Sequence, residues 1–402
     1  MIRVIPLAFL GILVLFGCSR AQSETGAGGW SQAMAEGGLD AALTSLQEQE
    51  QTPETAFLSG GVSFLAAVEH ILQVRYRTYS GALPMVPGMR NELPPNPDAR
   101  FDPAFVAEAM EGALGHLSAA EQALGPAIDG SFAAEVALDT IWFDINANET
   151  REDWEGLLAL LAALNGAPDE DFEGIVRFDT ADAEWLKAYV HVVSGMAELT
   201  LSLDPTPAIQ HVSDGRAALE AVGNLQGLGF AGDDFVDVAA ATLLALRGVP
   251  DAGRTGTALT HFQAMIAHNK AFWAEIGEET DNDREWLPNP DQTSAFGVEI
   301  DADMAAAWQD VLDEIEAILN GERFVPYWRV GSATGGEENG APVGLNIGAI
   351  LQNPGDMDPV LWIQGSAAVP YLETGEIADM AAWRQFAQMT RGDSLLFAVL
   401  LN

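Results

Sequence analysis

The sequence predicts a mainly α protein, an irregular multi-helix domain with a small β or extended part at its C-terminal end. Two patterns carry this prediction. Apolar residues recur at helical spacing along most of the chain, in segments rich in alanine and leucine. After residue 324, glycine and turn signals replace that pattern. Because 48% of the 402 residues are hydrophobic and 19% are charged, the chain can bury a large core.

The first eighteen residues have the features of an export signal. Arg3 precedes an apolar run over 4–16, which is short for a membrane span but suits a secretory signal. The run ends in Leu-Phe-Gly-Cys at 15–18, which resembles the lipobox of bacterial lipoproteins. This resemblance implies cleavage before Cys18, the one cysteine of the chain, and attachment of lipid to it. Conventional cleavage after Ala21 is the alternative.

The anchor and the charge determine the expected location and partners. Several acyl chains on Cys18 would hold the protein on the inner or outer membrane of a bacterium, with its globular part in the periplasm or at the cell surface. Removal of the signal, whose one charged residue is Arg3, takes the formal charge from −41 to −42. Such an acidic chain is not expected to bind nucleic acid. The expected partners are the membrane, through the lipid, and an unknown envelope protein or small ligand.

We expect five segments along the chain. A signal peptide, 1–17, is followed by a polar tether, 18–30. A first helical half covers 31–166 and central helices cover 167–256. The second helical half, with the glycine-rich and partly extended C-terminal part, covers 257–402. After the signal, no segment approaches eighteen uninterrupted apolar residues, so this remainder is expected to be soluble.

Start and stop signals place the individual helices. Thr52 is a capping residue and Pro53 fits the first position of a helix that continues to about residue 77. Asp102 and Pro103 start the next helix, which we expect to stop near Gly125. Further helices are expected at 151–164, 181–203, 207–223, 234–247, 257–275 and 301–319, with a short one at 380–389.

Two stretches about half a chain apart are similar to each other. Residues 64–70, FLAAVEH, and 262–268, FQAMIAH, share the pattern F-x-A-x-[VI]-x-H. Each is followed by an Asn-Pro-Asp loop, at 96–98 and 289–291, and then by a long helix that ends in glycine. We therefore predict a duplicated helix–loop–helix unit. The alternative is chance similarity between alanine-rich helices, which would not account for the repeated loop.

The segment DINANETREDWE, at 144–155, has the spacing of an EF-hand calcium loop. The candidate calcium ligands are Asp144, Asn146, Asn148, Thr150 (through its carbonyl), Glu152 and Glu155, at positions 1, 3, 5, 7, 9 and 12. Glu149 stands where this loop needs glycine, so a working site would be weak or would need a ligand from elsewhere. The alternative is that Asn148 or Thr150 only caps a helix beginning near Glu152.

A second acidic stretch, at 278–286, places four carboxylates at alternate positions. They are Glu279, Asp281, Asp283 and Glu285. In a turn, alternate carboxylates can converge on a cation, but such a run is more often a solvated loop. Since residue 292, twelfth from Asp281, is Gln292 rather than glutamate, the stretch is not an EF-hand.

The six histidines do not predict a metal site. His261 and His268 can share a helix face, but two turns apart they are too distant to bind one zinc ion on their own. His70 and His268 occupy matching places in the two similar stretches, which suggests a shared structural role such as a buried hydrogen bond.

The chain has no G-x-S-x-G, P-loop or dinucleotide-binding motif. Its ten tryptophans and many carboxylates leave one enzymatic alternative, a cell-envelope glycan hydrolase or carbohydrate-binding protein. Yet Trp154, Trp185 and Trp308 lie on apolar helix faces, where core packing is expected. We assign no catalytic residue and expect a binding or interaction role rather than an enzyme.

Four longer stretches are distinctive together. They are ADAEWLKAYVHVVSGMAEL (181–199), DNDREWLPNPDQTS (281–294), FVPYWRV (324–330) and VLWIQGSAAVPYLE (360–373). They resemble a family of uncharacterised bacterial exported proteins, over a range from about residue 55 to the C-terminus. The resemblance implies no activity. It does imply that some members carry a regular D-x-D-x-D-G loop in place of DINANE, which favours a weakened calcium loop at 144–155.

Overall fold

A computed structural model gives the arrangement of most of the chain. It describes residues 29–78, 93–160, 174–223, 225, 233–295, 299–330, 342–390, 398 and 401. The protein is mainly helical with two small antiparallel sheets, which confirms the predicted fold class. The predicted signal peptide, Cys18 and nearly all of the tether lie outside the described residues.

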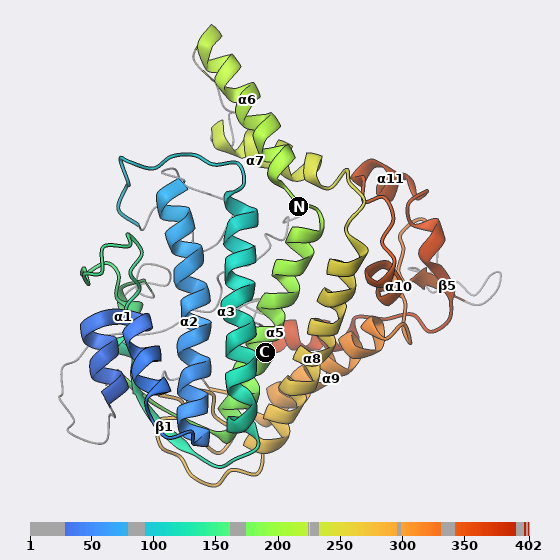
Figure 1. The fold of residues 1–402 in the computed structure, drawn as a ribbon. Helices are drawn as coiled ribbons and strands as arrows, with labels where there is room; N and C mark the ends of the chain where they lie inside the picture. The colour runs from blue at the N-terminus through green and yellow to red at the C-terminus, as the bar shows by residue number, and fades with distance from the viewer. Residues whose placement is uncertain are drawn as a thin grey trace.

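Four long helices lie side by side and form the body of the molecule (Figure 1). They are α2 (Pro53–Thr78), α3 (Phe105–Ile128), α5 (Thr180–Ser202) and α8 (Ala252–Ile276). Helix α1 (Gly29–Gln47) packs on α2. The buried residues recur along one or more faces of each helix, as the apolar spacing of the sequence predicts.

The expected capping residue Thr52 starts α2, whereas α3 begins at Phe105, after Asp102 and Pro103, without a side-chain cap. The Thr55 amide donates to Oγ1 of Thr52 (3.2 Å), and the Thr52 amide donates to Oγ1 of Thr55 (2.9 Å). Oδ1 of Asp251 accepts a hydrogen bond from the Arg254 amide at 2.9 Å. This cap begins α8 five residues before the expected position, 257, because Asp251 satisfies the free amides of its first turn.

Two further expected helix boundaries were wrong. Helix α3 continues past Gly125 and through Pro126 to Ile128, because a proline in the last turn breaks few backbone bonds. The helix expected at 151–164 begins at Leu157, and residues 151–156 form turns instead. They do so because the carboxylate of Glu155 accepts hydrogen bonds from amides of the preceding loop. The residues of that helix after 160 lie outside the described range.

Helix α1 is kinked at Gly38, and at this kink it contacts the segment that carries the EF-hand-like loop. Gly38 has φ 74°, a conformation that glycine adopts without steric cost. A Cβ atom there would lie 3.2 Å from Cζ2 of Trp142. The indole Nε1 of Trp142 donates to the Met34 carbonyl at 2.8 Å. The buried tryptophan therefore joins the loop region to α1.

A two-stranded sheet lies at one end of the helices and was not expected from the sequence. Strand β1 (Ala133–Ala137) pairs antiparallel with β2 (Ile175–Asp179), with Ala133 opposite Asp179. A short 3-10 helix, Leu138–Thr140, follows β1. Because β2 runs directly into α5, the sheet fixes where α5 begins.

The C-terminal part contains the short strands that the sequence predicts. Strands β3 (Val325–Pro326), β4 (Val343–Leu345) and β5 (Leu372–Thr374) form an antiparallel sheet in that order. A second small core of four buried residues lies beside it, made of Tyr327, Leu345, Ala368 and Tyr371. Another 3-10 helix, Val369–Tyr371, precedes β5.

Short helices complete this part of the chain. Helix α11 (Pro359–Gln364) lies in the part of the chain that was expected to be partly extended, and Asp358 caps it by accepting from the Val360 amide at 2.8 Å. Helix α10 (Ile347–Gln352) is capped in the same way by Asn346. The expected helices at 301–319 and 380–389 are α9 (Ala302–Leu319) and α12 (Ala381–Met389).

The two Asn-Pro-Asp loops have the same hydrogen bonds. Nδ2 of Asn96 donates to the Tyr76 carbonyl near the end of α2, and Nδ2 of Asn289 donates to the Ile276 carbonyl at the end of α8, both at 2.9 Å. In each loop the aspartate amide, two residues on, donates to Oδ1 of that asparagine, again at 2.9 Å. The packing of the two units differs, because α3 lies along α2 whereas α9 runs away from α8 (Figure 1).

A helical hairpin projects from the body (Figure 1). It consists of α6 (Thr206–Val222), in which Ala208 is the one buried residue, and α7 (Asp233–Ala245). Its two ends meet at the body, where the Asp251 amide donates to the Ser202 carbonyl at 2.8 Å.

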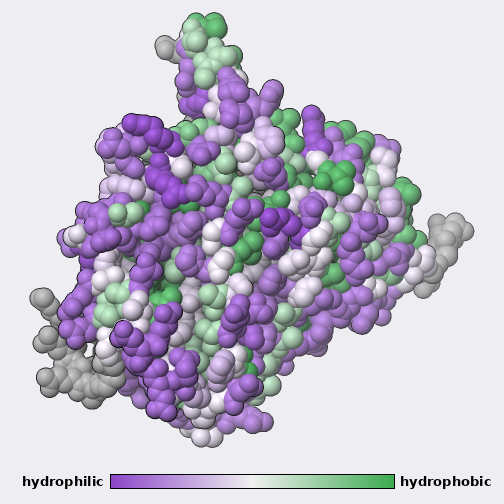
Figure 2. All heavy atoms as spheres, in the orientation of Figure 1, coloured by the Kyte–Doolittle hydropathy of each residue, from purple (hydrophilic) through white to green (hydrophobic). Residues whose placement is uncertain are grey.

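The main hydrophobic core extends from Trp30 to Leu401 and crosses the three expected segments 31–166, 167–256 and 257–402. Figure 2 shows a mostly hydrophilic surface, with hydrophobic side chains gathered over the C-terminal part. Exposed apolar residues in that part include Trp328, Val330, Val360, Ile363 and Val369.

Candidate cation-binding sites

Backbone pairing brings the two ends of the 144–155 segment together. Trp142 and Gly156 form an antiparallel bridge. The Phe143 amide donates to the Glu155 carbonyl, and the Leu157 amide donates to the Ile141 carbonyl, both at 2.9 Å. The first and last candidate ligands, Asp144 and Glu155, therefore lie at the neck of a closed loop.

The carboxylate of Asp144 faces the inside of this loop. Its two oxygens accept hydrogen bonds from the amides of Asn148 (2.9 Å) and Glu149 (3.0 Å). Glu149 has φ 58°, the left-handed conformation for which an EF-hand uses glycine. Glutamate thus adopts the required turn here, at a steric cost that glycine avoids.

Glu155 closes the loop from the other end and has no exposed surface. Its Oε1 accepts from the Ile145 amide at 2.9 Å, and its Oε2 accepts from the Glu152 amide at 3.1 Å. Burial raises the pKa of the Glu155 carboxyl, while these backbone hydrogen bonds act in the opposite direction. Glu155 is therefore an inward-facing acid, as position 12 of a calcium loop requires.

The four candidate ligands in the middle of the loop mainly form hydrogen bonds within the loop itself. Oδ1 of Asn146 accepts from the Asn148 amide at 3.1 Å, and its Nδ2 donates to Oε2 of Glu152 at 2.6 Å. Oδ1 of Asn148 accepts from the Thr150 amide at 2.8 Å, which is an Asx-turn. Because the next helix begins at Leu157, the alternative in which Asn148 or Thr150 caps a helix at Glu152 is wrong.

Helix α2 brings a further acid, Glu69, to the loop, and the loop's own sequence does not indicate it. Oε2 of Glu69 accepts a hydrogen bond from the Asp144 amide at 2.7 Å, and Nε2 of Gln73 donates to the Asp144 carbonyl at 2.8 Å. Burial, with the charges of Asp144, Asp40 and Glu155, raises the pKa of Glu69 to about 7. The one hint in the sequence was the position of Glu69, a charged residue within the apolar helical stretch 64–70.

The second acidic stretch is not simply a solvated loop. Glu279 is half-buried and Glu285 is 3% exposed, whereas Asp281 and Asp283 face solvent. The carboxylates of Glu279 and Glu285 lie close to that of Asp179, at the end of β2. One oxygen from each of the three lies within 4.8 Å of the other two. We call Asp179, Glu279 and Glu285 the carboxylate cluster.

Local structure holds the carboxylate cluster in place. The Arg177 amide donates to the Arg284 carbonyl at 3.1 Å, which lays the 284–285 segment against β2. Oε1 of Glu285 accepts from the Asp283 amide at 2.7 Å. Asp179 also caps α5, since its carboxylate accepts from the Ala181 amide at 3.2 Å. Positions more than a hundred residues apart are thereby fixed at one place.

Negative charge is in excess at this cluster. Arg177 pairs with Asp179 at 3.4 Å and with Asp281 at 2.7 Å. Burial raises the pKa values of Asp179, Glu279 and Glu285, that of Glu279 to about 8, and repulsion among the carboxylates adds to this effect. A bound cation would relieve the repulsion.

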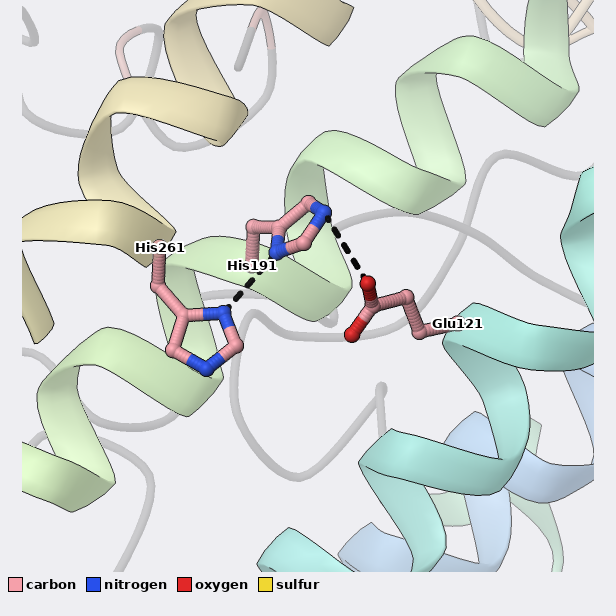
Figure 3. Close-up of side chains that lie close together, drawn as sticks. All are labelled: Glu121, His191 and His261. Atoms are coloured by element: carbon pink, nitrogen blue, oxygen red, sulfur yellow. Dashed lines mark hydrogen bonds and ion pairs between the residues drawn. The ribbon is translucent and has the colours of Figure 1, made fainter. Parts of the chain in front are cut away.

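The structure also gathers histidines that the sequence analysis left apart. His191 of α5 lies between His261 of α8 and Glu121 of α3 (Figure 3). Burial, together with the neighbouring histidines, lowers the pKa of His191 to about 3, and burial lowers the pKa of His261. Sequence spacing relates histidines only within one helix, and Glu121, His191 and His261 belong to three different helices.

Comparisons with protein families, with curated proteins and with solved structures found no match to this chain. Function must therefore be inferred from the sites themselves.

The left-handed conformation at Glu149 yields a stability prediction. Replacement of Glu149 by glycine is expected to stabilise the fold by about 1 kcal/mol, because it removes the steric cost of a positive φ. Urea unfolding followed by circular dichroism measures this change. Asp153→Gly is the matched control, since Asp153 is exposed and has no positive φ. An equal gain in the control, or a loss in Glu149→Gly, would contradict the prediction.

The raised carboxyl pKa values predict that the metal-free protein is more stable in mild acid than in mild base. A carboxyl whose pKa rises on folding contributes stability that is complete below its unfolded pKa and is lost as pH rises through its folded pKa. For Glu279 this window extends from 4.5 to about 8. The melting temperature, measured in chelator, should therefore fall between about pH 5.5 and about pH 8.5.

Glu279→Gln should flatten this pH dependence, because glutamine cannot ionise. Glu278→Gln is the control, since Glu278 is exposed at the adjacent position. If both variants keep the pH slope of the wild type, Glu279 is not a source of it.

Proposed function

We propose that this chain is a lipid-anchored cell-envelope protein with a binding or interaction role, whose fold is completed by a divalent cation of the calcium type. The observation that carries the proposal is the carboxylate cluster, in which three acids from two distant segments converge within 4.8 Å. The EF-hand-like loop at 144–155 is the second candidate position for the same ion.

The donor chemistry of the cluster favours a hard cation. Its three side chains supply oxygen ligands alone, and calcium takes six to eight oxygens from carboxylates, carbonyls and water. The amide of Gln292, which donates to Oε2 of Glu279 at 3.1 Å, lies beside the cluster. With Arg177 paired to Asp179 and Asp281, a divalent ion would still find net negative charge.

The EF-hand-like loop supports the proposal in a different way. Its end residues, Asp144 and Glu155, already direct their carboxylates into the loop. Glu69 lies against the Asp144 backbone and provides the acid from elsewhere that the imperfect sequence needs. A calcium ion would have to replace several amide hydrogen bonds of these carboxylates, so binding at this loop should be weak.

The envelope location rests on the sequence of the first eighteen residues. Among the described residues, α2 is long and apolar enough to cross a membrane, but 67% of its most apolar window is buried in the fold. Since α2 packs against α1 and α3, it is a core helix of the body. The proposed membrane attachment is therefore the lipid on Cys18.

The glycan-binding alternative has less support. All ten tryptophans fall within the described residues, and Trp328 is the exposed one, at 65%. Trp185 and Trp308 are buried, and Trp154 stacks on Tyr76, as core packing predicts. Trp328 belongs to the C-terminal part, in a different element from the carboxylate cluster.

Calcium should stabilise the full-length chain, purified in detergent and treated with chelator. At a hundredfold excess over Kd, one site adds about 2.7 kcal/mol to the free energy of unfolding. We expect a saturable rise in melting temperature that Glu279→Gln reduces strongly and Asp144→Ala reduces less.

The controls for calcium are Glu278→Gln for the cluster and Asp153→Asn for the loop, which remove the same charge from exposed positions. No response of the wild type would refute cation binding at both sites. A response that is unchanged in both Glu279→Gln and Asp144→Ala would assign the ion elsewhere.

The anchor is tested separately by growth with a labelled fatty acid. We expect the label in the wild-type chain and its loss in Cys18→Ser, because the thiol is the attachment point. Ser19→Ala, one residue further on, should keep the label. A chain that takes up no label, or keeps it without Cys18, would exclude lipidation at this residue.

A further inference from the structure

A second kind of ligand set lies between three helices of the body. His191 of α5 is 5% exposed, and each of its ring nitrogens faces another ligand-type group (Figure 3). Its Nδ1 is 2.9 Å from Nδ1 of His261 on α8. Its Nε2 is 3.9 Å from Oε1 of Glu121 on α3. One ligand atom from each residue lies within 4.8 Å of the other two.

We propose that Glu121, His191 and His261 form a binding site for a borderline divalent transition-metal ion, with zinc as the reference ion. This site goes beyond the proposed calcium function, because its donors, its position and its selectivity are different.

The donor types determine the class of metal. Two imidazoles with one carboxylate are a ligand set of catalytic zinc sites and, in facial arrangement, of iron(II) sites. Calcium and magnesium prefer oxygen ligands alone, so they compete poorly for two imidazole nitrogens. Three protein ligands leave a fourth position for water. The side chain of Glu121 is 38% exposed, which gives that position access to solvent.

The two Nδ1 atoms of His191 and His261 already face each other. A hydrogen bond between two Nδ1 atoms needs one ring as donor and the other as acceptor. In a tetrahedral site with Zn–N distances of about 2.0–2.1 Å, two ligand nitrogens lie about 3.3 Å apart. The observed separation is 2.9 Å, so the rings must move apart by a few tenths of an ångström, and each must turn so that its Nδ1 lone pair points at the ion rather than at the other ring. The ion would replace the shared proton.

Glu121 completes the set by rotation of its side chain. Its Oε1 now faces Nε2 of His191, whereas the ion would lie on the Nδ1 side of that ring. The Glu121 side chain must therefore turn toward His261 to bind the ion. The partly exposed position of Glu121 leaves room for that rotation. A long side chain on a helix surface loses little when it changes rotamer.

Neighbouring residues hold the two rings. His268 stacks on His191 with ring centroids 5.4 Å apart and planes at 7°, and its Nδ1 bonds to the Glu184 carboxylate. This stacking restricts the orientation of the His191 ring. Gly195 lets α5 and α8 approach closely, since a Cβ atom there would lie 2.7 Å from Cε1 of Phe262. The separation of the two metal-binding histidines is thus set by rigid helices.

The experiment uses the full-length chain, purified in detergent and treated with chelator. Zinc is titrated by calorimetry, and cobalt(II) is added as a probe whose visible spectrum reports nitrogen and oxygen coordination. We expect one zinc per chain at this site. His261→Gln should weaken binding by more than about a hundredfold and Glu121→Gln by at least about tenfold, since outer-shell changes alone cost about 10–100-fold.

His211→Gln is the matched control, because His211 is exposed on the projecting hairpin and should leave zinc affinity unchanged. Glu121→Gln tests a partly exposed position, so it should fold normally even if changes at the histidines disturb packing. Zinc binding should persist in Glu279→Gln and Asp144→Ala, and the calcium response should persist in His261→Gln. The two proposals can therefore fail independently.

Absence of zinc and cobalt binding by the wild type would overturn the proposal and leave the histidine pair as a hydrogen bond between helices. Equal zinc affinity in the wild type, His261→Gln and Glu121→Gln would do the same. A cobalt spectrum that is present in the wild type, lost in His261→Gln and kept in His211→Gln would support it.

Discussion

The burial of α5 is the constraint on which the rest of the structure depends. This helix packs against α3 and α8 and continues directly from β2, so almost no face of it is free for solvent. Small residues such as Ser194 and Gly195 permit this packing, and Phe262 of α8 fills the space beside Gly195. A helix buried on several faces must also pair every polar group that it carries. Asp182 therefore bonds to the Asp179 amide at its start, and His191 lies against His261 farther along.

The two candidate cation sites beside α5 differ in the type of their ligands. At the start of α5, loops bring carboxylates together, because a loop can turn alternate side chains inward and present oxygen from several directions. Within the helical layer, facing side chains come from rigid helices at fixed separation, and there the structure places imidazoles. The oxygen ligands of the carboxylate cluster thus come mainly from loops, whereas the candidate histidine ligands come from helices. Some of the many acidic residues lie inside the protein, since Glu155, Asp182 and Glu285 are buried.

Much of the fold could be predicted from local sequence. Capping residues and apolar spacing identify the long helices, because both signals act within a few turns. The 144–155 loop was found for the same reason, since its ligands follow a fixed local order. The acid from α2, Glu69, could not be found in this way, and neither could the contact of His191 with His261. These contacts join residues about 70 positions apart, and they exist only because helices pack at particular faces. The β1–β2 pair was missed because its strands are short and 37 residues separate them.

The two ends of the α6–α7 hairpin lie next to each other at the body, so the hairpin is a separate unit inserted between α5 and α8. The chain leaves the body after Ser202 and returns at Asp251, and a backbone hydrogen bond joins these two residues. Helices α5 and α8 therefore meet as if a short turn connected them. Changes of length or sequence within the hairpin can accumulate without altering the order or spacing of the body helices. The hairpin is thus free to diverge while the helical layer that carries His191 and His261 stays the same.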